Sequence, residues 1–458
     1  MLLTYELKKM PGVPLYEALY RCIRGDILSG RLSAGQKLPS KRALAAHLEV
    51  SKITVEAAYN QLAAEGYIAA KEKVGYFVEA VAHPYAPAHV PPARKPSAAA
   101  GCRIDLTANT PAKFPFSVWT RLQRQVLLDF GQQLLEPVPH SGVAALRQAI
   151  ALHLAEFRGM QVDPENIVIG AGTDFLYNLL LQLLGQDRVY ALEEPGYGKI
   201  RRIYDAAGAK SIPAPMDNLG VIPEAIAEAQ VLHISPSHHF PTGLITPQSR
   251  RQALLSWAQA GERWIIEDDY DSEFRFDAHP MSAMYTPWQE GRVIYMNSFS
   301  KSLAPSIRIG YMVLPPALMR QFQHRLGFYS CTVSSFEQHA LARFLSEGHF
   351  EKHINRMRKF YRSRRNRLLE ILKNCRWAPL LTIEEADAGL HFLVKVDTQL
   401  SDQELESFCR KLGLKVWCLS NYYHGTIPVS SLHRIVVNYS GLSDEDLELL
   451  QQILNVEI

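Results

Sequence analysis

Hydrophobic residues recur at helical spacing in the first part of the chain. One helical face carries Leu15, Leu19, Cys22, Ile23 and Ile27. This spacing predicts an amphipathic helix, which Ser29 and Gly30 end. Ser40 and Ser51 are the predicted N-caps of two further short helices, because a serine oxygen can accept a hydrogen bond from a free backbone N–H of the first turn. Two short helices in this arrangement are typical of a helix-turn-helix.

A hairpin and a proline-rich segment follow these helices. Residues 67–71 and 76–78 are strand-like runs across a short turn, and they predict a hairpin that would form a wing. From about residue 80 to 102 the chain is rich in proline and alanine and lacks the apolar periodicity of a packed element. We interpret residues 80–102 as a semi-rigid linker between a first domain, residues 1–79, and a second, residues 103–458.

After the linker, strand-like and helix-like runs alternate. The strand-like runs are residues 167–169, 188–192, 231–234, 264–267, 293–296 and 309–314, and the helix-like runs are 175–184, a segment near Lys199, and 248–260. Such alternation predicts an α/β domain in which helices cover a mainly parallel sheet, with ligands beyond the carboxyl ends of the strands. Further strand-like runs at 389–394 and 435–439 predict a small α/β subdomain. We expect the large subdomain to span about 140–345 and the small one about 103–139 and 346–458.

The distribution of charge singles out the first domain. Residues 1–80 hold 11 Lys/Arg against 8 Asp/Glu, which leaves 38 against 38 for the remainder, so the formal charge of +3 is entirely N-terminal. This segment is the candidate for nucleic-acid binding. A basic run at residues 355–365 is compatible with a second nucleic-acid-binding surface. We prefer to interpret it as a long helix whose basic face is exposed to solvent.

Cysteine spacing and the chain start bear on metal content and location. The six cysteines show no CxxC spacing, so they suggest neither a metal site nor a disulfide framework. The start has no signal-peptide pattern, and no apolar run is long enough to cross a bilayer. We expect a cytoplasmic protein without a membrane partner.

Lys301 is the most informative single residue. It lies among small hydroxyl residues in a loop between two buried strand-like runs, where desolvation lets a lysine lose its proton and add to a carbonyl as a Schiff base. A lysine taken alone is more often a solvated surface charge. Other strand ends supply complementary chemistry: a glycine-rich turn at 170–174, an aromatic ring at Tyr197, and a run of acids at 267–271, with Arg308 shortly after the lysine.

Together these groups match the requirements of pyridoxal 5′-phosphate (PLP): a phosphate cradle, a stacking ring, a carboxylate for the pyridinium nitrogen and a lysine. The stretches 194–197 (EPGY), 236–243 (PSHHFPTG), 267–275 (EDDYDSEFR) and 298–311 (SFSKSLAPSIRIGY) carry a specific likeness. Through them, the chain from about residue 103 resembles a fold-type I aminotransferase. The whole chain resembles the MocR/GabR-type regulators, in which such a domain follows a GntR-type winged helix.

The resemblance implies roles for individual residues of the second domain. Lys301 would form the Schiff base, Asp268 would pair with the pyridine nitrogen, Tyr270 would neighbour the phenolic oxygen and Tyr197 would stack on the ring. The implied phosphate ligands are Gly172, Thr173, Ser298 and Arg308. Arg434 resembles the small-domain arginine that binds a ligand carboxylate; otherwise it is a surface charge on an edge strand.

The first domain carries its own resemblance. Residues 35–45 (GQKLPSKRALA), 50–55 (VSKITV) and 62–68 (LAAEGYI) closely resemble the winged helix-turn-helix of GntR-type regulators. The resemblance implies that the helix after Ser51 enters a major groove by its N-terminal end. The residues implied for DNA contact are Ser40, Lys41, Arg42, Lys52, Thr54, Lys73 and Gly75.

One departure bears on catalysis. Simple aminotransferases often read Asn-Pro-Thr-Gly where this chain has Phe240-Pro241-Thr242-Gly243, so an asparagine that would hydrogen-bond the cofactor oxygen is missing there. His238 or His239 is a candidate substitute, and a structural loop histidine is the alternative. The change weakens the expectation of efficient transamination more than that of PLP binding.

These observations lead to two functional hypotheses. The first is a homodimeric transcription regulator that reads paired DNA half-sites and responds, through Lys301, to an amino compound or to PLP itself. The second is a working aminotransferase whose N-terminal domain only tethers or tunes it.

Overall fold

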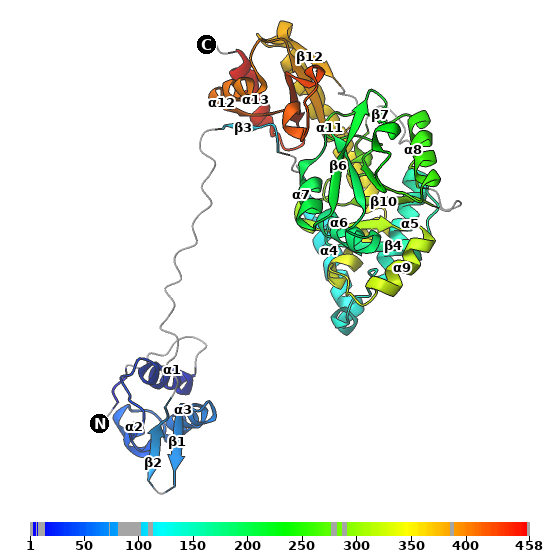
Figure 1. Cartoon of the computed structure of the whole chain (residues 1–458). Coiled ribbons are helices and arrows are strands. Elements are labelled where there is room, and N and C mark those ends of the chain that lie inside the picture. The colour runs from blue at the N-terminus through cyan, green and yellow to red at the C-terminus, as the bar shows by residue number, and fades with distance from the viewer. Residues whose placement is uncertain are drawn as a thin grey trace. The chain divides into compact units, whose positions relative to one another are not determined.

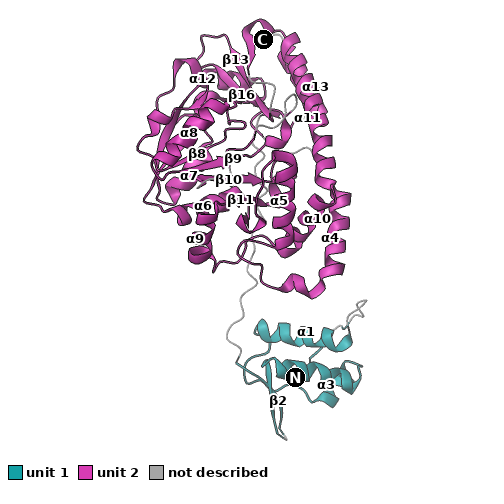
Figure 2. Ribbon diagram, turned by 90° about the vertical axis from the view of Figure 1, so that its right-hand side faces the viewer, with its two compact units in different colours: residues 1–98 teal, residues 99–458 magenta. Residues whose placement is uncertain are grey.

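The structure divides into two compact units. It is a computed structural model that describes residues 3–5, 7, 14–72, 74–80, 102–108, 113–275, 282–285, 291–384 and 389–455. The units comprise residues 1–98 and 99–458, which are teal and magenta in Figure 2. The predicted linker lies almost entirely outside the described residues. Within the described ranges, none of the helices is long and apolar enough to cross a membrane.

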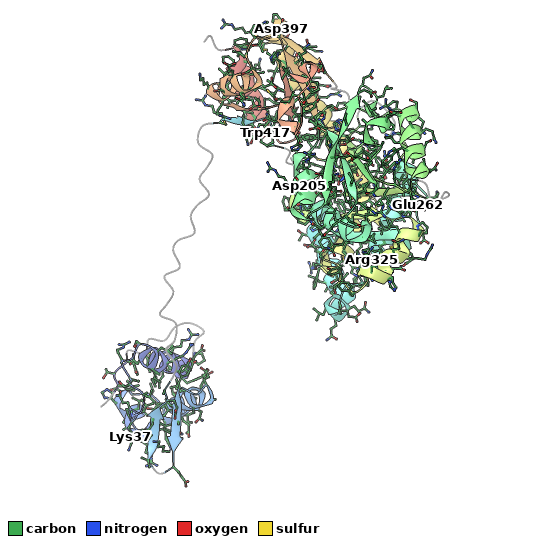
Figure 3. All side chains as sticks on the ribbon, viewed as in Figure 1. Lys37, Asp205, Glu262, Arg325, Asp397 and Trp417 are labelled. Carbon is green, nitrogen blue, oxygen red and sulfur yellow. The ribbon has the colours of Figure 1, made fainter. Side chains whose placement is uncertain are left out.

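The first unit is a small helical domain followed by a hairpin. Its elements are α1 (Leu15–Leu28), α2 (Lys41–His47), α3 (Lys52–Ala64), β1 (Ile68–Lys71) and β2 (Gly75–Val78) (Figure 1). Both predicted N-caps are confirmed: Ser40 Oγ accepts from the Ala43 N–H at 3.2 Å, and Ser51 Oγ accepts from the Thr54 N–H at 3.1 Å. β1 and β2 pair antiparallel, and Lys37, labelled in Figure 3, forms a further bridge to β2. The predicted winged helix-turn-helix is confirmed.

The face predicted for α1 is the face that packs inward. Leu19, Ile23 and Ile27 are buried in one cluster with Val55 and Leu62 of α3. Because burial of apolar side chains is the main stabilising contribution in so small a domain, this shared core fixes α3 against α1 and leaves the N-terminal turn of α3 free.

The second unit is built on an eight-stranded sheet. In spatial order its strands are β4 (Ile167–Gly170), β11 (Gly310–Val313), β10 (Val293–Ser298), β9 (Trp264–Asp268), β8 (Val231–Ile234), β5 (Val189–Glu194), β6 (Lys210–Asp217) and β7 (Gly220–Val221). Neighbours from β10 through β6 are parallel, whereas β11 is antiparallel to both of its neighbours and β7 to β6. The prediction of a mainly parallel sheet is confirmed. The alternation missed β6, whose Pro213 and Pro215 are unusual in a strand. Both prolines lie before Met216 and Asp217, the residues through which β6 pairs with the short edge strand β7.

Helices cover both faces of this sheet. They are α5 (Ala144–Arg158), α6 (Thr173–Leu184), α7 (Gly198–Ala206), α8 (Gln248–Ala260), α9 (Pro316–Leu326) and α10 (Ser335–Ser346). Successive side chains of a strand point to opposite faces. On β9, Trp264 and Ile266 join the core of α6, α7 and α9, whereas Ile265 joins the core of α5, α8 and α10. Burial on both faces explains the continuous apolar runs from which the strands were predicted.

The small subdomain follows the long helix α11 (His349–Asn374). Its sheet has the order β12 (Leu381–Glu384), β13 (His391–Val396), β16 (Arg434–Asn438), β15 (Trp417–Cys418), and its helices are α12 (Asp402–Lys411) and α13 (Asp444–Asn455). β14 (Leu414–Lys415) pairs with β3 (Ile104–Asp105). By contrast α4 (Phe116–Phe130), which we had placed in the small subdomain, packs on α10, with the Trp119 and Phe344 rings 5.7 Å apart (Figure 2).

Candidate cofactor site and DNA interface

Five loops meet at the carboxyl edge of the large sheet. β4, β5, β8, β9 and β10 point in the same direction, so the residues that follow them line one edge. The loops are residues 170–174, 194–197, 235–243, 268–271 and 298–301. Apart from Arg308, every predicted cofactor residue lies in one of them.

Asp268 ends β9 and is buried among polar partners. The Tyr177 hydroxyl of α6 donates to Asp268 Oδ2, and His233 Nε2 lies 3.4 Å from the same oxygen. The Tyr204 hydroxyl lies 2.8 Å from Nδ1 of His233 and holds that ring in place. Asp268 Oδ1 is buried and has no hydrogen-bond partner among the described residues. A buried carboxylate oxygen without a partner is costly, so this atom is ready to accept a ligand N–H.

Lys301 lies in the turn after β10 and is partly buried. Ser298, the last residue of that strand, donates its N–H to Asn297 Oδ1 at 2.5 Å, and His353 of α11 donates to the Ser302 carbonyl at 2.9 Å. These contacts fix the turn on both sides of the lysine. Burial lowers the pKa of Lys301 from 10.5 to about 8, while the charge of Asp271 acts in the opposite direction.

This shifted pKa makes a testable prediction. Because only the neutral amine adds to an aldehyde, the rate at which cofactor-free protein takes up PLP covalently should rise with pH through a midpoint near about 8. Asp271 stabilises the ammonium form, so Asp271→Asn should move the midpoint to lower pH. Stopped-flow measurements in buffer that contains a metal chelator would test both shifts. A midpoint near the ordinary lysine value, unchanged in Asp271→Asn, would contradict the prediction.

Gly172, Thr173 and Arg308 meet at the N-terminus of α6, where Thr173 is the first helical residue. Gly172 has φ of 83°, and a Cβ there would lie 2.8 Å from Arg308 Cζ, so only glycine leaves room for the guanidinium. Arg308 donates to a carbonyl of the turn at 3.0 Å, and both Arg308 and Lys199 face Asp174, at 3.4 and 2.7 Å. A helix N-terminus flanked by two cations suits a phosphate.

The arrangement fits PLP. Asp268 Oδ1 offers an unpaired acceptor for a pyridinium N–H, Lys301 offers an amine of lowered pKa, and the α6 turn with Arg308 offers an anion cradle. These three groups come from different strand ends, as a cofactor with three polar ends requires. The fit to PLP is inferred from groups of the chain itself, among them the buried Asp268 Oδ1 that has no hydrogen-bond partner among the described residues.

Aromatic side chains line the open side of the same edge. Tyr197 is the N-cap residue of α7 and is 50% exposed, with its ring edge-on to Phe240 at 5.8 Å. Phe240 occupies the position where simple aminotransferases often carry asparagine, and it also contacts the rings of His391 at 5.0 Å and Tyr422 at 5.3 Å. At this position the chain therefore provides ring packing in place of a hydrogen bond.

The two histidines that precede this phenylalanine differ in role. His238 Nδ1 lies 2.8 Å from Asp271 Oδ2 and 3.2 Å from the Tyr270 hydroxyl. His239 Nδ1 lies 2.7 Å from Thr242 Oγ1, and burial lowers its pKa to about 3. His239 is thus a buried residue of the turn, whereas His238 lies beside Tyr270, the predicted neighbour of the phenolic oxygen.

Arg434 lies on β16 close enough to Tyr423 for its charge to oppose the rise that burial causes in the pKa of that hydroxyl, and its binding of a ligand carboxylate stays a prediction. In the small sheet it pairs in register with Lys395 of β13. Its guanidinium forms a two-point ion pair with Glu384, at 2.7 and 3.1 Å.

The predicted DNA contacts of the first unit are not equally available. Arg42 and Lys52 are exposed in the first turns of α2 and α3. Lys41, by contrast, is paired with Glu56 at 2.7 Å and lies 5.3 Å from the centre of the Tyr76 ring, so its side chain ties α2 to α3 and the hairpin. Arg42 and Lys52 are the better candidates for phosphate contact.

The remaining predicted DNA residues lie at caps and at the wing. Ser40 is an exposed N-cap, and the Thr54 hydroxyl lies 2.8 Å from Ser51 Oγ. Gly75 opens β2 with φ of 129°, and Lys73 lies outside the described residues. Ile53, which we had not singled out, is 77% exposed in the first turn of α3. An exposed branched side chain at that place suits the methyl group of thymine in a major groove.

Several polar residues of the cofactor edge escaped prediction. Tyr177 and His233 contact Asp268, and His391 borders the site from β13. Each of the three is a polar residue inside an otherwise apolar run of the sequence. A polar residue in such a run is the feature by which each could have been predicted. Burial, with Asp268 and others adding, raises the pKa of Tyr177 well above its usual value, which keeps it a donor.

Comparisons with known proteins agree with this geometry. Residues 103–454 match the family of aminotransferase class I and II, and residues 15–78 match the bacterial regulatory proteins of the gntR family. The chain is 36% identical to the HTH-type transcriptional regulator YdeL of Bacillus subtilis, over 97% of both chains. It is 32% identical to the probable rhizopine catabolism regulatory protein MocR of Rhizobium meliloti, over 96% of this chain and 93% of that one.

A third relative and a solved structure complete the comparison. The HTH-type pyridoxine biosynthesis transcriptional regulator PdxR of Corynebacterium glutamicum is 31% identical over 93% of this chain and 91% of its own. The Pyrococcus horikoshii kynurenine aminotransferase shares the fold, with a TM-score of 0.67 at 24% identity over 77% of this chain and 89% of that one. The gntR-family domain binds DNA, and the aminotransferase class I and II domain implies pyridoxal 5′-phosphate as the cofactor. The chain belongs to the MocR-type transcriptional regulators, in which a GntR-type winged helix precedes an aminotransferase-like domain.

Proposed function

We propose that this regulator senses an amino compound at Lys301 and passes the signal to its DNA-binding domain. The observation that carries the proposal is a DNA-binding domain in one chain with a partly buried lysine of lowered pKa, beside a carboxylate and an anion cradle. Bound PLP supplies an electrophilic carbon that reacts reversibly with amines. Lys301 and an incoming amine compete for that position, so the occupancy of Lys301 reports the amine concentration.

The pairing of Arg434 favours sensing over metabolic turnover. Efficient transamination of amino acids requires that the ligand carboxylate be held so that the reacting carbon is oriented. Arg434, the predicted group for this task, is held by Glu384 in a two-point ion pair with which a ligand carboxylate must compete. Phe240, where aminotransferases often have asparagine, packs against rings. Both features support binding of an amino compound without rapid conversion.

PLP itself is a second candidate effector. The name of the relative PdxR refers to regulation of pyridoxine biosynthesis, whereas that of MocR refers to rhizopine catabolism. In the first case Lys301 would report cofactor supply, and in the second it would report a small molecule. The protein must have one conformation that binds DNA tightly and another that binds it weakly. Either effector can change the DNA affinity only as far as its own affinities for these two conformations differ.

We further propose a homodimer that acts in the cytoplasm and reads paired half-sites. Phe116, Leu127 and Leu128 are exposed on α4, and Leu135 is exposed just after it. Such a gathering of exposed apolar side chains is typical of an interaction surface. A dimer would carry two winged helices (residues 1–79), each joined through residues 80–102 to its PLP-binding domain (residues 103–458), and paired half-sites suit two such heads.

The decisive experiment follows the cofactor and the DNA together. Cofactor-loaded protein is titrated with a panel of amines while the cofactor absorbance, the affinity for DNA upstream of its own gene and the release of keto acid are recorded. We expect an amine that changes the absorbance to change DNA affinity by about 5–150-fold, as for ordinary allosteric coupling. A parallel titration of cofactor-free protein with PLP alone tests the second candidate effector.

Two outcomes would contradict the sensor proposal. One is steady keto-acid release with DNA affinity unchanged by every amine and by PLP, which would favour the aminotransferase. The other is DNA binding that does not weaken with salt, because phosphate contacts of a winged helix release counterions and must be salt-dependent.

A further inference from the structure

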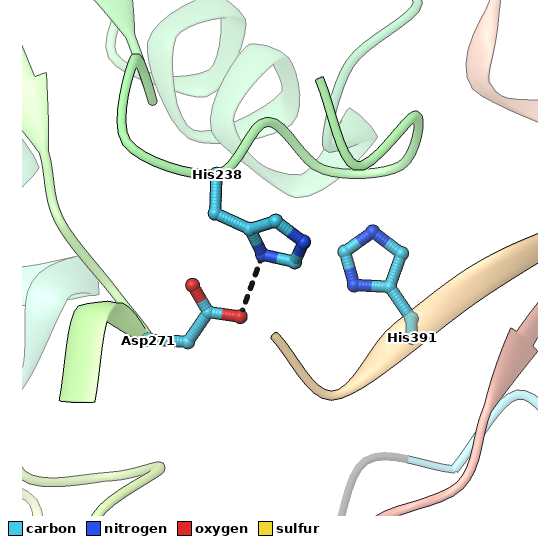
Figure 4. A group of neighbouring side chains, drawn as sticks. All are labelled: His238, Asp271 and His391. Carbon is cyan, nitrogen blue, oxygen red and sulfur yellow. Dashed lines mark hydrogen bonds and ion pairs between the residues drawn. The ribbon is translucent and has the colours of Figure 1, made fainter. Parts of the chain in front are cut away.

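Three buried ligand-type side chains converge next to Lys301. His238 follows β8, Asp271 follows β9 and His391 opens β13 (Figure 4). One nitrogen or oxygen atom from each lies within 4.8 Å of the other two, and His238 Nδ1 is 2.8 Å from Asp271 Oδ2. The three come from separate elements, so the tertiary fold alone assembles them.

The two imidazoles are left with unused nitrogens. His238 Nε2 is buried without a partner among the residues that the structure describes, and the buried ring nitrogens of His391 have the Pro241 backbone as a polar neighbour but no hydrogen bond of good geometry. A buried polar atom without a partner costs about 1–3 kcal/mol. His391 packs against Phe240 and His238 through its ring faces and edges, which a phenylalanine would do equally well. Packing therefore does not account for an imidazole at this position.

The surrounding backbone holds the rings in place. Gly389 has φ of 67°, and a Cβ there would lie 1.8 Å from His238 Cε1, so the ring is seated against bare backbone. The Tyr439 hydroxyl donates to the Gly389 carbonyl, and the Gly389 N–H donates to the Phe274 carbonyl at 3.1 Å. Ligand-type side chains held this firmly by the chain are what a preorganised site requires.

We propose that His238, Asp271 and His391 bind a divalent transition-metal ion, for which Zn²⁺ is the best match. Two imidazoles and one carboxylate are a common catalytic zinc set, which leaves a fourth position open to a small ligand. An ion about 2.1 Å from each ligand atom requires those atoms to lie within about 4.2 Å of one another, so the cluster needs only a small closing movement. The site borders the PLP-binding groups, since His238 Nδ1 lies 3.2 Å from the Tyr270 hydroxyl, but it does not depend on the proposed sensing role.

The test uses full-length, cofactor-loaded protein that has been dialysed against a chelator. Co²⁺ is titrated first because, unlike Zn²⁺, it reports its geometry in the visible spectrum. We expect about one Co²⁺ per chain, with the intense bands of a low-coordinate nitrogen and oxygen site, and displacement of Co²⁺ by Zn²⁺. Binding through the free cysteines would instead show thiolate charge-transfer bands and would overturn the proposal.

Matched variants locate the ion. His238→Gln, Asp271→Asn and His391→Gln should each weaken binding by more than about 100-fold, the upper range for altering an outer partner of a metal ligand. His424→Gln removes an exposed histidine outside the cluster and should leave the affinity unchanged. Equal affinity in all four variants would overturn the proposal. If a cluster variant fails to fold, the spectrum of the wild-type protein is the deciding measurement. Absence of the Co²⁺ bands of a nitrogen and oxygen site would then overturn the proposal.

Discussion

Replacing Lys301 with alanine is expected to abolish covalent attachment of PLP while leaving the protein folded and able to bind DNA. Lys301 lies in the turn after β10, where burial lowers the pKa of its amine to about 8. Alanine is smaller and carries no polar group, so it leaves no buried charge without a partner. After borohydride reduction and denaturation, the wild-type chain should retain its cofactor, whereas Lys301→Ala should release all of it, as mass spectrometry of the intact chain would show.

A second lysine at the same edge provides the control. Lys199 lies 2.7 Å from Asp174 near the N-terminus of α6 and is exposed. Lys199→Ala should weaken PLP affinity modestly through loss of a cation near the phosphate, yet keep the covalent bond. Covalent cofactor in Lys301→Ala, or its loss in Lys199→Ala, would show that the anchor is another residue. Lys301→Ala should also make DNA affinity insensitive to every amine that acts on the wild type.

The strands of the large sheet could be predicted because most of them are buried on both faces. Side chains of β9 enter two cores in alternation, so the strand reads as an uninterrupted apolar run that a sequence pattern detects. The strand β6, which has only the two-residue β7 on its outer side, lacks this burial and contains two prolines, so it gave no such signal. The parallel order then placed the loops of Asp268 and Lys301 at one edge, since β9 and β10 are adjacent and parallel.

The residues and contacts that the sequence did not predict depend on how separate elements pack against one another. Tyr177 acquires its role only because α6 packs where β9 ends, and His391 only because the small sheet lies against the loop after β8. The ion-pair partner of Arg434 could not be predicted from its neighbours in sequence, because it comes from another strand of the small sheet. That partner is Glu384, which is distant in sequence.

Breaking the buried ion pair between Arg158 and Asp269 should strongly destabilise the second unit. Arg158 closes α5, and its guanidinium lies 3.1 Å from Asp269 Oδ2, with both side chains 1% exposed. The Tyr295 hydroxyl donates to the same carboxylate at 2.6 Å. Removing one charge from a buried pair leaves the other uncompensated in a medium of low polarity, which typically costs about 3–5 kcal/mol. A surface pair of similar geometry loses at most about 1 kcal/mol, because water solvates the remaining charge.

Asp269→Asn should therefore lower the free energy of unfolding of the second unit by about 3–5 kcal/mol. The change keeps the size of the side chain and removes its charge, so the loss measures the missing charge together with the hydrogen bonds that the carboxylate accepts. All six tryptophans lie after residue 118, so tryptophan fluorescence in urea reports on the second unit without a contribution from the winged helix. The matched control is Asp217→Asn, which breaks the Arg250–Asp217 surface pair at 2.7 Å and should cost at most about 1 kcal/mol. Equal losses in the two variants would mean that Arg158 finds compensation elsewhere, from groups such as Glu267 and Glu273, whose charges also raise its pKa.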